Sequence, residues 1–151
     1  MTGGLDAVDV VAVVPSTHYR HGEHPLAATL RSVSSLGDRV VDALAVGAAA
    51  VTRNGPSPDA YMARKDLVGS RRVLLVDDTY TTGAHLHSAA GALLSAGAST
   101  VLPLVVGRRQ NEQWPPSRRL LEWAAQPEHR WSADRCVRCW SEARPAGTAG
   151  A

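Results

Sequence analysis

Three short runs of Val and Leu limit the folds open to this chain. Each run is almost continuously apolar and is bounded by polar or turn residues, which is typical of strands in a parallel sheet that is covered on both faces. We therefore predict buried strands at Val8 to Val14, Val73 to Val76 and Val101 to Val106. A fourth segment, Ala45 to Thr52, is ambiguous because its alanines suit a helix as well as a strand.

Helical patterns alternate with these runs. The segment Ala84 to Ala96 has apolar residues at helical spacing and is followed by Gly97, a natural helix stop. A second helix is expected to begin at Pro25, because proline is favoured in the first turn. Its apolar face comprises Leu26, Leu30 and Val33. The alternation predicts an α/β fold, a single domain with a mainly parallel central sheet flanked by helices.

Composition supports one soluble-type domain and excludes several classes. The chain has 151 residues, 44% of them hydrophobic, and a net charge of +2, so neither disorder nor bulk electrostatic binding of nucleic acid is expected. No apolar run is long enough to cross a bilayer, and the first one lacks the basic flank of a secretory signal. The only cysteines are Cys136 and Cys139, which exclude a disulfide framework. We expect a cytoplasmic protein that contacts no membrane.

The chain is expected to change character near residue 108. We assign 1–108 to the α/β core, 109–144 to a helical, Trp-rich extension, and 145–151 to a disordered tail. Within the extension, Ser117 to Ala125 predicts a short helix whose Leu120, Leu121 and Ala124 face a core. The tryptophans there suit core packing, although a base pocket or a partner surface stays open; they are Trp114, Trp123, Trp131 and Trp140.

The segment Val73 to Gly83 carries the clearest chemical signal. An apolar strand ends in Asp77 and Asp78, and a loop rich in hydroxyl groups and ending in glycine then opens a helix. Ligands of open parallel sheets sit at the carboxyl ends of strands, and a helix N-terminus offers free amides to a phosphate. The two carboxylates can accept hydrogen bonds from a sugar diol, so the segment predicts a site for a phosphorylated sugar.

Two other interpretations fit parts of this segment. The acids of an isolated Asp-Asp pair are usually just solvated, and Thr82 alone could cap the helix. A phosphoacceptor receiver domain also contains a strand that ends in paired acids. Too few residues follow Asp78 for that fold, and no aspartate lies between Asp78 and Asp134 to take the phosphoryl group.

Residues 73–83 resemble the phosphoribosyl diphosphate (PRPP) binding motif of type I phosphoribosyltransferases. The resemblance implies a reduced form of that fold, in which Asp77 and Asp78 bind the ribose hydroxyls. It assigns the 5-phosphate to the loop that follows, which is Thr79, Tyr80, Thr81, Thr82 and Gly83. It further implies Mg²⁺ that is held through the substrate, with no direct protein ligand, and it allows a homodimer.

The chain is most similar to the competence protein F group, which is described as amidophosphoribosyltransferase-like. By that resemblance the segment after the first strand is a pyrophosphate loop, formed by Pro15, Ser16, Thr17 and Arg20. The segment Arg53 to Ser70 has no clear period and is expected to be a loop, either a functional lid or a mere linker. Arg64 and Lys65 in it are candidates to neutralise the leaving group. This group usually carries an N-terminal zinc module, whereas the sequence given starts directly at its first predicted strand.

The expected function is transfer of a phosphoribosyl group from PRPP to an unidentified base or amine, with release of pyrophosphate. The Arg-rich segment that this group usually has before the motif strand is shortened here to residues 61–66. This departure keeps an alternative open, in which the protein binds PRPP or a nucleotide without turnover and acts with a partner in regulation or DNA uptake. Position 81 is Thr, whereas relatives that act on 6-oxopurines have an acidic base there.

Sites for metals other than Mg²⁺ have weaker support in the sequence. Cys136 and Cys139 form half of a zinc site, with His129 and Asp134 as candidate further ligands, yet two ordinary thiols is the expected state. His18, His21 and His24 are interpreted as a polar loop near the phosphates. His85 and His87 lie at the start of the motif helix; His85 could approach a bound ligand, but an ordinary solvated histidine is the expected interpretation of both.

Overall fold

The computed structural model describes residues 7–16, 23–51 and 55–129. The chain divides into two compact units, one that ends at Arg109 and one that begins at Gln110. Thr17, Arg20, the two cysteines, Trp131, Trp140 and the predicted tail lie outside the described residues.

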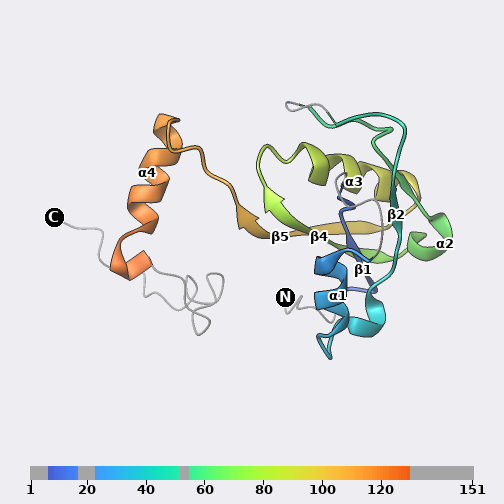
Figure 1. Cartoon of the computed structure of the whole chain (residues 1–151). Coiled ribbons are helices and arrows are strands. Elements are labelled where there is room, and N and C mark those ends of the chain that lie inside the picture. The colour runs from blue at the N-terminus through green and yellow to red at the C-terminus, as the bar shows by residue number, and fades with distance from the viewer. Residues whose placement is uncertain (1–6, 17–22, 52–54, 130–151) are drawn as a thin grey trace, which may run out of the picture. The chain divides into compact units, whose positions relative to one another are not determined.

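A three-stranded parallel sheet forms the centre of the first unit (Figure 1). Its strands are β1 (Val10–Val13), β4 (Arg72–Tyr80) and β5 (Thr100–Arg108), in the order β1-β4-β5. Both neighbouring pairs run parallel, with Val10 opposite Val73 and Leu74 opposite Leu102. The predicted α/β class and parallel sheet are confirmed, and each of the three apolar runs contributes one strand.

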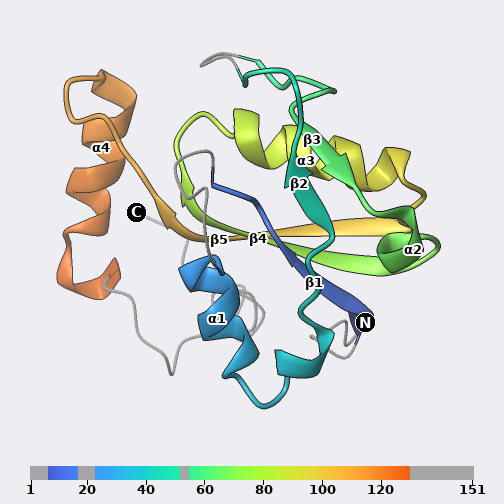
Figure 2. The ribbon, with the colours of Figure 1, turned by 45° about the vertical axis from the view of Figure 1, so that its right-hand side comes forward.

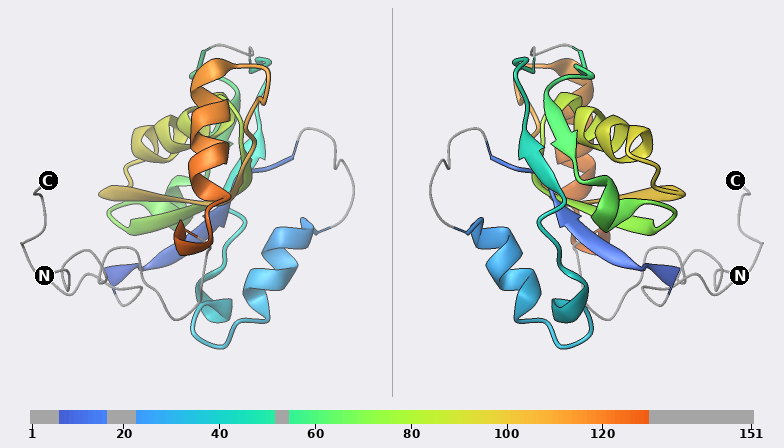
Figure 3. Two further views of the ribbon diagram at one scale, coloured as in Figure 1. Left: turned by 90° about the vertical axis from the view of Figure 1, so that its left-hand side faces the viewer. Right: turned by 90° about the vertical axis from the view of Figure 1, so that its right-hand side faces the viewer.

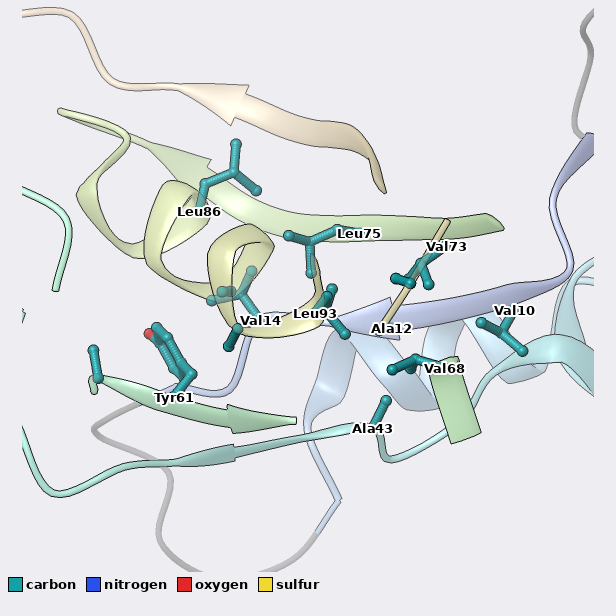
Figure 4. Close-up of a cluster of buried hydrophobic side chains, with 14 residues drawn as sticks. Val10, Ala12, Val14, Ala43, Tyr61, Val68, Val73, Leu75, Leu86 and Leu93 are labelled. Carbon is teal, nitrogen blue, oxygen red and sulfur yellow. The ribbon is translucent and has the colours of Figure 1, made fainter. Parts of the chain in front are cut away.

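Helices cover the two faces of this sheet (Figures 2 and 3). The helix α3 (Ala84–Ser95) packs on one face, where Leu86 and Leu93 join a core with Val73 and Leu75 (Figure 4). The helix α1 (Pro25–Arg31) packs on the other face through Ala27, against Val11, Leu74 and Val76. Because side chains alternate along β4, odd and even positions supply the two cores separately. Both predicted helices are confirmed, although α1 ends before Val33, which lies in a turn.

The segment expected to be a loop over Arg53 to Ser70 has regular structure in its described part. It contains β3 (Tyr61–Ala63), which pairs antiparallel with β2 (Leu44–Val46), and the short helix α2 (Lys65–Val68). A 3₁₀ helix, Gly37–Arg39, precedes β2. The loop expectation was wrong because Ala60, Tyr61 and Val68 are at most 3% exposed and belong to the core under α3. Of the ambiguous segment, the structure describes residues 45–51, and of these Ala45 and Val46 belong to β2.

The third predicted strand, β5, is not buried on both faces. Leu102, Leu104 and Val106 are 42%, 46% and 69% exposed, and all three lie at alternate positions. β5 is the edge strand of the sheet, and the core beneath α1 reaches only β1 and β4. Its opposite side packs better, since Val101 and Val105 contact the core under α3.

The second unit contains α4 (Pro115–Ala124) and a 3₁₀ helix, Pro127–His129. The helix was predicted, but its expected core contact was wrong, because Leu120 and Ala124 are exposed. Trp114 and Trp123 are likewise 55% and 52% exposed rather than packed in a core. Within the described residues, no helix has the length and apolar character needed to cross a membrane.

Candidate functional site

The paired acids lie in the part of β4 that extends past its neighbour. β1 ends at Val13, opposite Val76, whereas β4 continues to Tyr80 and stays paired with β5. Asp77 and Asp78 therefore lie inside the strand, whereas the sequence suggested that they follow it. The pleat directs successive side chains to opposite faces, so the two carboxylates leave the strand on opposite faces of the sheet.

A cavity of about 440 Å³ lies at this carboxyl edge of the sheet. It brings together six of the predicted site residues, namely Pro15, Ser16, Asp77, Asp78, Thr79 and Thr81. The remaining lining residues are Val14, His24, Tyr61, His85 and Arg109. Three predicted positions, Tyr80, Thr82 and Gly83, do not line it. The loop after β1 and the end of β4 thus share one concave site, although they are about sixty residues apart in sequence.

The loop between β4 and α3 has unpaired backbone amides, and of its residues Thr81 lines the cavity. In the described part of the chain, the backbone N–H groups of Thr81, Thr82 and Gly83 donate no hydrogen bond to another residue. They are followed by the first turn of α3, whose amides also lack helical partners and carry the positive end of the helix dipole. Thr82 Oγ1 lies 3.4 Å from the amide nitrogen of Ala84 and accepts its hydrogen bond. Thr82 therefore caps the start of the helix, which is the alternative role that its sequence position also allows.

The side chain of Tyr80 packs against this loop at Gly83. Gly83 has a φ of 81°, in the left-handed region that favours glycine. A Cβ built on Gly83 would lie 2.5 Å from the hydroxyl oxygen of Tyr80, so the ring occupies the space that glycine leaves free. The guanidinium carbon of Arg108 lies 5.8 Å from the centre of the same ring. Tyr80 and Gly83 therefore shape the loop and do not face the cavity.

Charges of both signs line the cavity. Burial raises the pKa of Asp77, and the neighbouring Asp78 raises it further, while hydrogen bonding to the amide of Asp78 and the nearby His85 and His24 oppose that rise. Arg109 supplies a cation at the far end of the adjacent strand β5. A ligand that carries both hydroxyl groups and anionic oxygens would match this mixture.

Sequence reasoning missed Tyr61 and Arg109 as lining residues. Arg109 directly follows β5, at the same sheet edge as the acids, so its position after a predicted strand was a usable signal. Tyr61 reaches the site from a segment that was expected to be a loop. His85 is exposed, as expected, and it also lines the cavity and contacts Tyr61, whereas His87 is exposed and does not line it.

Arg64 and Lys65 stand away from the cavity. Lys65 begins α2 and Arg64 precedes it, and neither is among the residues that line the site. The guanidinium of Arg64 lies 2.8 Å from the carboxylate of Asp66, which raises the pKa of Arg64. In this conformation the described part of the 53–70 segment brings no cation to the acids.

A second cavity of about 570 Å³ adjoins the first and shares Pro15, Ser16 and His24 with it. Most of its other lining residues are apolar, from α1 and from the stretch between Val40 and Val46. Arg31 lies at its rim in ion pairs with Glu23 and Asp42.

The donor set fits Mg²⁺ that arrives with a ligand. No group of three His, Cys, Asp or Glu side chains that could hold a metal occurs among the described residues. Mg²⁺ commonly keeps several waters and binds through substrate phosphates, and the hard oxygens of Asp77 and Asp78 lie in the cavity where such an ion would come. Of the zinc candidates, only His129 is described; its ring stacks on Trp123 at 3.8 Å between ring centres, with Nδ1 2.8 Å from the carbonyl oxygen of Trp123.

Chemically, the site can accept hydrogen bonds at one end and donate them at the other. No family model, no curated protein and no solved structure matches this chain. Its function is therefore inferred from the geometry of this cavity and from the motif in β4 and the loop after it.

Proposed function

We propose that the protein has a reduced type I phosphoribosyltransferase fold and binds PRPP at the carboxyl edge of its sheet. The observation that carries the proposal is one cavity lined by Asp77, Asp78 and Thr81, where the backbone amide of Thr81 donates no hydrogen bond within the described part of the chain. Carboxylates are the natural acceptors for a vicinal diol, and free amides at a helix start are natural donors to a phosphate. A ribose 5-phosphate unit satisfies both ends together.

The remaining parts of PRPP match the remaining lining residues. Arg109 and the loop of Pro15 and Ser16 lie in the same cavity and would face the diphosphate. Mg²⁺ held by the diphosphate oxygens would neutralise part of its charge when bound. The second cavity begins at Pro15, Ser16 and His24, which gives a base or amine acceptor a place next to the sugar.

In the proposed reaction, a nitrogen lone pair of the acceptor forms a bond to the anomeric carbon. The bond from that carbon to the diphosphate oxygen breaks, and pyrophosphate leaves with the electron pair. A proton is then lost from the acceptor nitrogen. The protein contributes by holding the two reactants in line and by stabilising charge on the leaving group and on the sugar.

Binding of PRPP without turnover is the second candidate function. It is favoured by the position of Arg64 and Lys65, which start α2 and bring no positive charge to the cavity. Such a protein would report PRPP or nucleotide levels to a partner, in regulation or in DNA uptake.

Isothermal titration with PRPP and Mg²⁺ tests the shared core of both candidates. We expect Asp77→Asn and Asp78→Asn each to weaken binding at least about tenfold, because each loses a charge-assisted hydrogen bond to the diol. Asp59→Asn is the matched control, since Asp59 is exposed and does not line the cavity. Undiminished affinity in both site variants would overturn the proposal. Pyrophosphate release across a panel of bases and amines then separates transfer from binding alone.

A further inference from the structure

Tyr61 and His85 form a hydrogen-bonded pair on the cavity wall. The hydroxyl oxygen of Tyr61 lies 2.7 Å from Nδ1 of His85 and 3.5 Å from the carbonyl oxygen of Pro15. Tyr61 is 3% exposed and sits in the core beside α3 (Figure 4), whereas His85 is exposed in the first turn of that helix. Three separate segments therefore meet at one phenol group: β3, the loop after β1, and the start of α3.

The position of the shared proton follows from the surroundings of Tyr61. Burial, assisted by the negative charge of Asp77, raises the pKa of Tyr61 to about 12, so the phenol keeps its hydrogen at neutral pH. The carbonyl of Pro15 is at the limit of hydrogen-bond length, whereas Nδ1 of His85 is at an ordinary distance. The shorter distance favours donation from the phenol to Nδ1, and in that tautomer of the imidazole the hydrogen lies on Nε2.

We propose that Tyr61 holds His85 in the Nε2–H tautomer, so that His85 donates a hydrogen bond to an anionic oxygen of the phosphorylated ligand. This inference rests on the proposed function and adds a donor that no part of the motif contains. Within the described residues, Nε2 of His85 has no hydrogen-bond partner, although the ring lines the cavity. Tyr61 acts through His85 and is a positioning residue.

A hydrogen-bond donor suits this place in the cavity. His85 is two residues after Gly83, close to the loop proposed to bind a phosphate, and the acids Asp77 and Asp78 line the same space. Of the two neutral tautomers, the one with the hydrogen on Nδ1 would present the lone pair of Nε2 to an anionic oxygen and would repel it. The contact with Tyr61 favours the other tautomer, which donates.

The tautomer is tested first on the free protein by nitrogen-15 NMR of the histidine side chains. We expect His85 to give the pattern of a protonated Nε2 and an unprotonated Nδ1, and Tyr61→Phe to disturb that pattern while the fold is kept, because the ring still fills the core. Protonated Nδ1 in the wild type would overturn the inference. This measurement needs no ligand, so it stands apart from the test of the proposed function.

The donor role is tested by titration with PRPP and Mg²⁺ on matched variants. Glutamine places an amide N–H near the position of Nε2, whereas asparagine places its amide near Nδ1. We expect His85→Asn to weaken binding about tenfold, the loss typical of one hydrogen bond to a charged group, and His85→Gln to restore most of it. Tyr61→Phe should weaken binding by a smaller factor, and the control His87→Gln should leave it unchanged, since His87 is exposed outside the cavity.

The outcomes separate the two proposals. If wild-type protein binds PRPP and Asp77→Asn abolishes binding while His85→Asn does not, the inference about His85 is wrong and the proposed function stands. If wild-type protein does not bind PRPP, the proposed function fails, and the NMR result alone still decides whether Tyr61 sets the tautomer. Equal losses for His85→Asn and His85→Gln would also overturn the donor role.

Discussion

Two glycines of α3 and its entry loop provide a sharp test of how the loop is built. Gly83 has a left-handed φ of 81°, and its missing Cβ leaves room for the side chain of Tyr80, whose hydroxyl oxygen lies 2.5 Å from where that Cβ would be. We expect Gly83→Ala to lower the free energy of unfolding by about 2 kcal/mol, combining about 1–2 kcal/mol for a left-handed alanine with about 0.5–1 kcal/mol for displacing Tyr80 from Arg108.

Gly91 is the matched control for this substitution. It lies inside α3, and a Cβ there would meet nothing within 4 Å. Gly91→Ala should therefore raise the free energy of unfolding by about 0.5–1 kcal/mol, because alanine favours a helix interior. Urea denaturation measures both changes. In a Tyr80→Leu background, Gly83→Ala should cost only the part due to the backbone angle. If Gly83→Ala stabilises the protein as Gly91→Ala does, the account of the loop is refuted.

The other predictions concern an ion pair, the core and the attachment of the 55–60 segment. Arg72 donates hydrogen bonds to the carboxylate of Asp9 from its side chain and its backbone amide, and these bonds lower the pKa of Asp9 to about 2. The stability that this pair contributes should therefore be complete above about pH 4 and be lost as the pH falls through 2. Acid-denaturation curves of Asp9→Asn should lack this loss. Leu75 is fully buried, so Leu75→Ala should cost about 2–5 kcal/mol in urea denaturation, and a cost below 1 kcal/mol would contradict its place in the core. Ser88 accepts a hydrogen bond from the amide of Ser57 at 2.8 Å, so Ser88→Ala should cost about 1–3 kcal/mol and speed hydrogen exchange at that amide, whereas unchanged exchange would show that the bond does not hold the segment.

The burial of a strand could be predicted from its own residues only where helices cover both of its faces. The residues of β1 and β4 are apolar at successive positions because helices cover both faces, and that pattern is visible in the sequence. The run in β5 has the same pattern, yet one face is exposed, because α1 does not extend over it. Pro103 within β5 was the local clue to an edge strand, since proline gives no amide to a neighbour.

The candidate site was predictable only where one segment carries it. Asp77, Asp78 and Thr81 were found because a strand, a pair of acids and a small loop follow one another in the sequence. Their place inside β4 was not visible, because the extra length of the strand depends on pairing with β5. Tyr61 was missed since its role depends on a hairpin whose strands are too short to leave a periodic signal.

The residues that reached the cavity from outside the motif change what the site can select. The acids and loop amides alone would fit any sugar phosphate, because both features come from β4 and the turn that follows it. In the proposed site, Tyr61 adds dependence on the β2–β3 hairpin, since the residue that contacts Nδ1 of His85 belongs to β3. Displacement of that hairpin would free Nδ1 and remove the bias toward an Nε2 donor. The proposal therefore ties ligand affinity to the packing of β3 on α3, a link that the motif by itself does not contain.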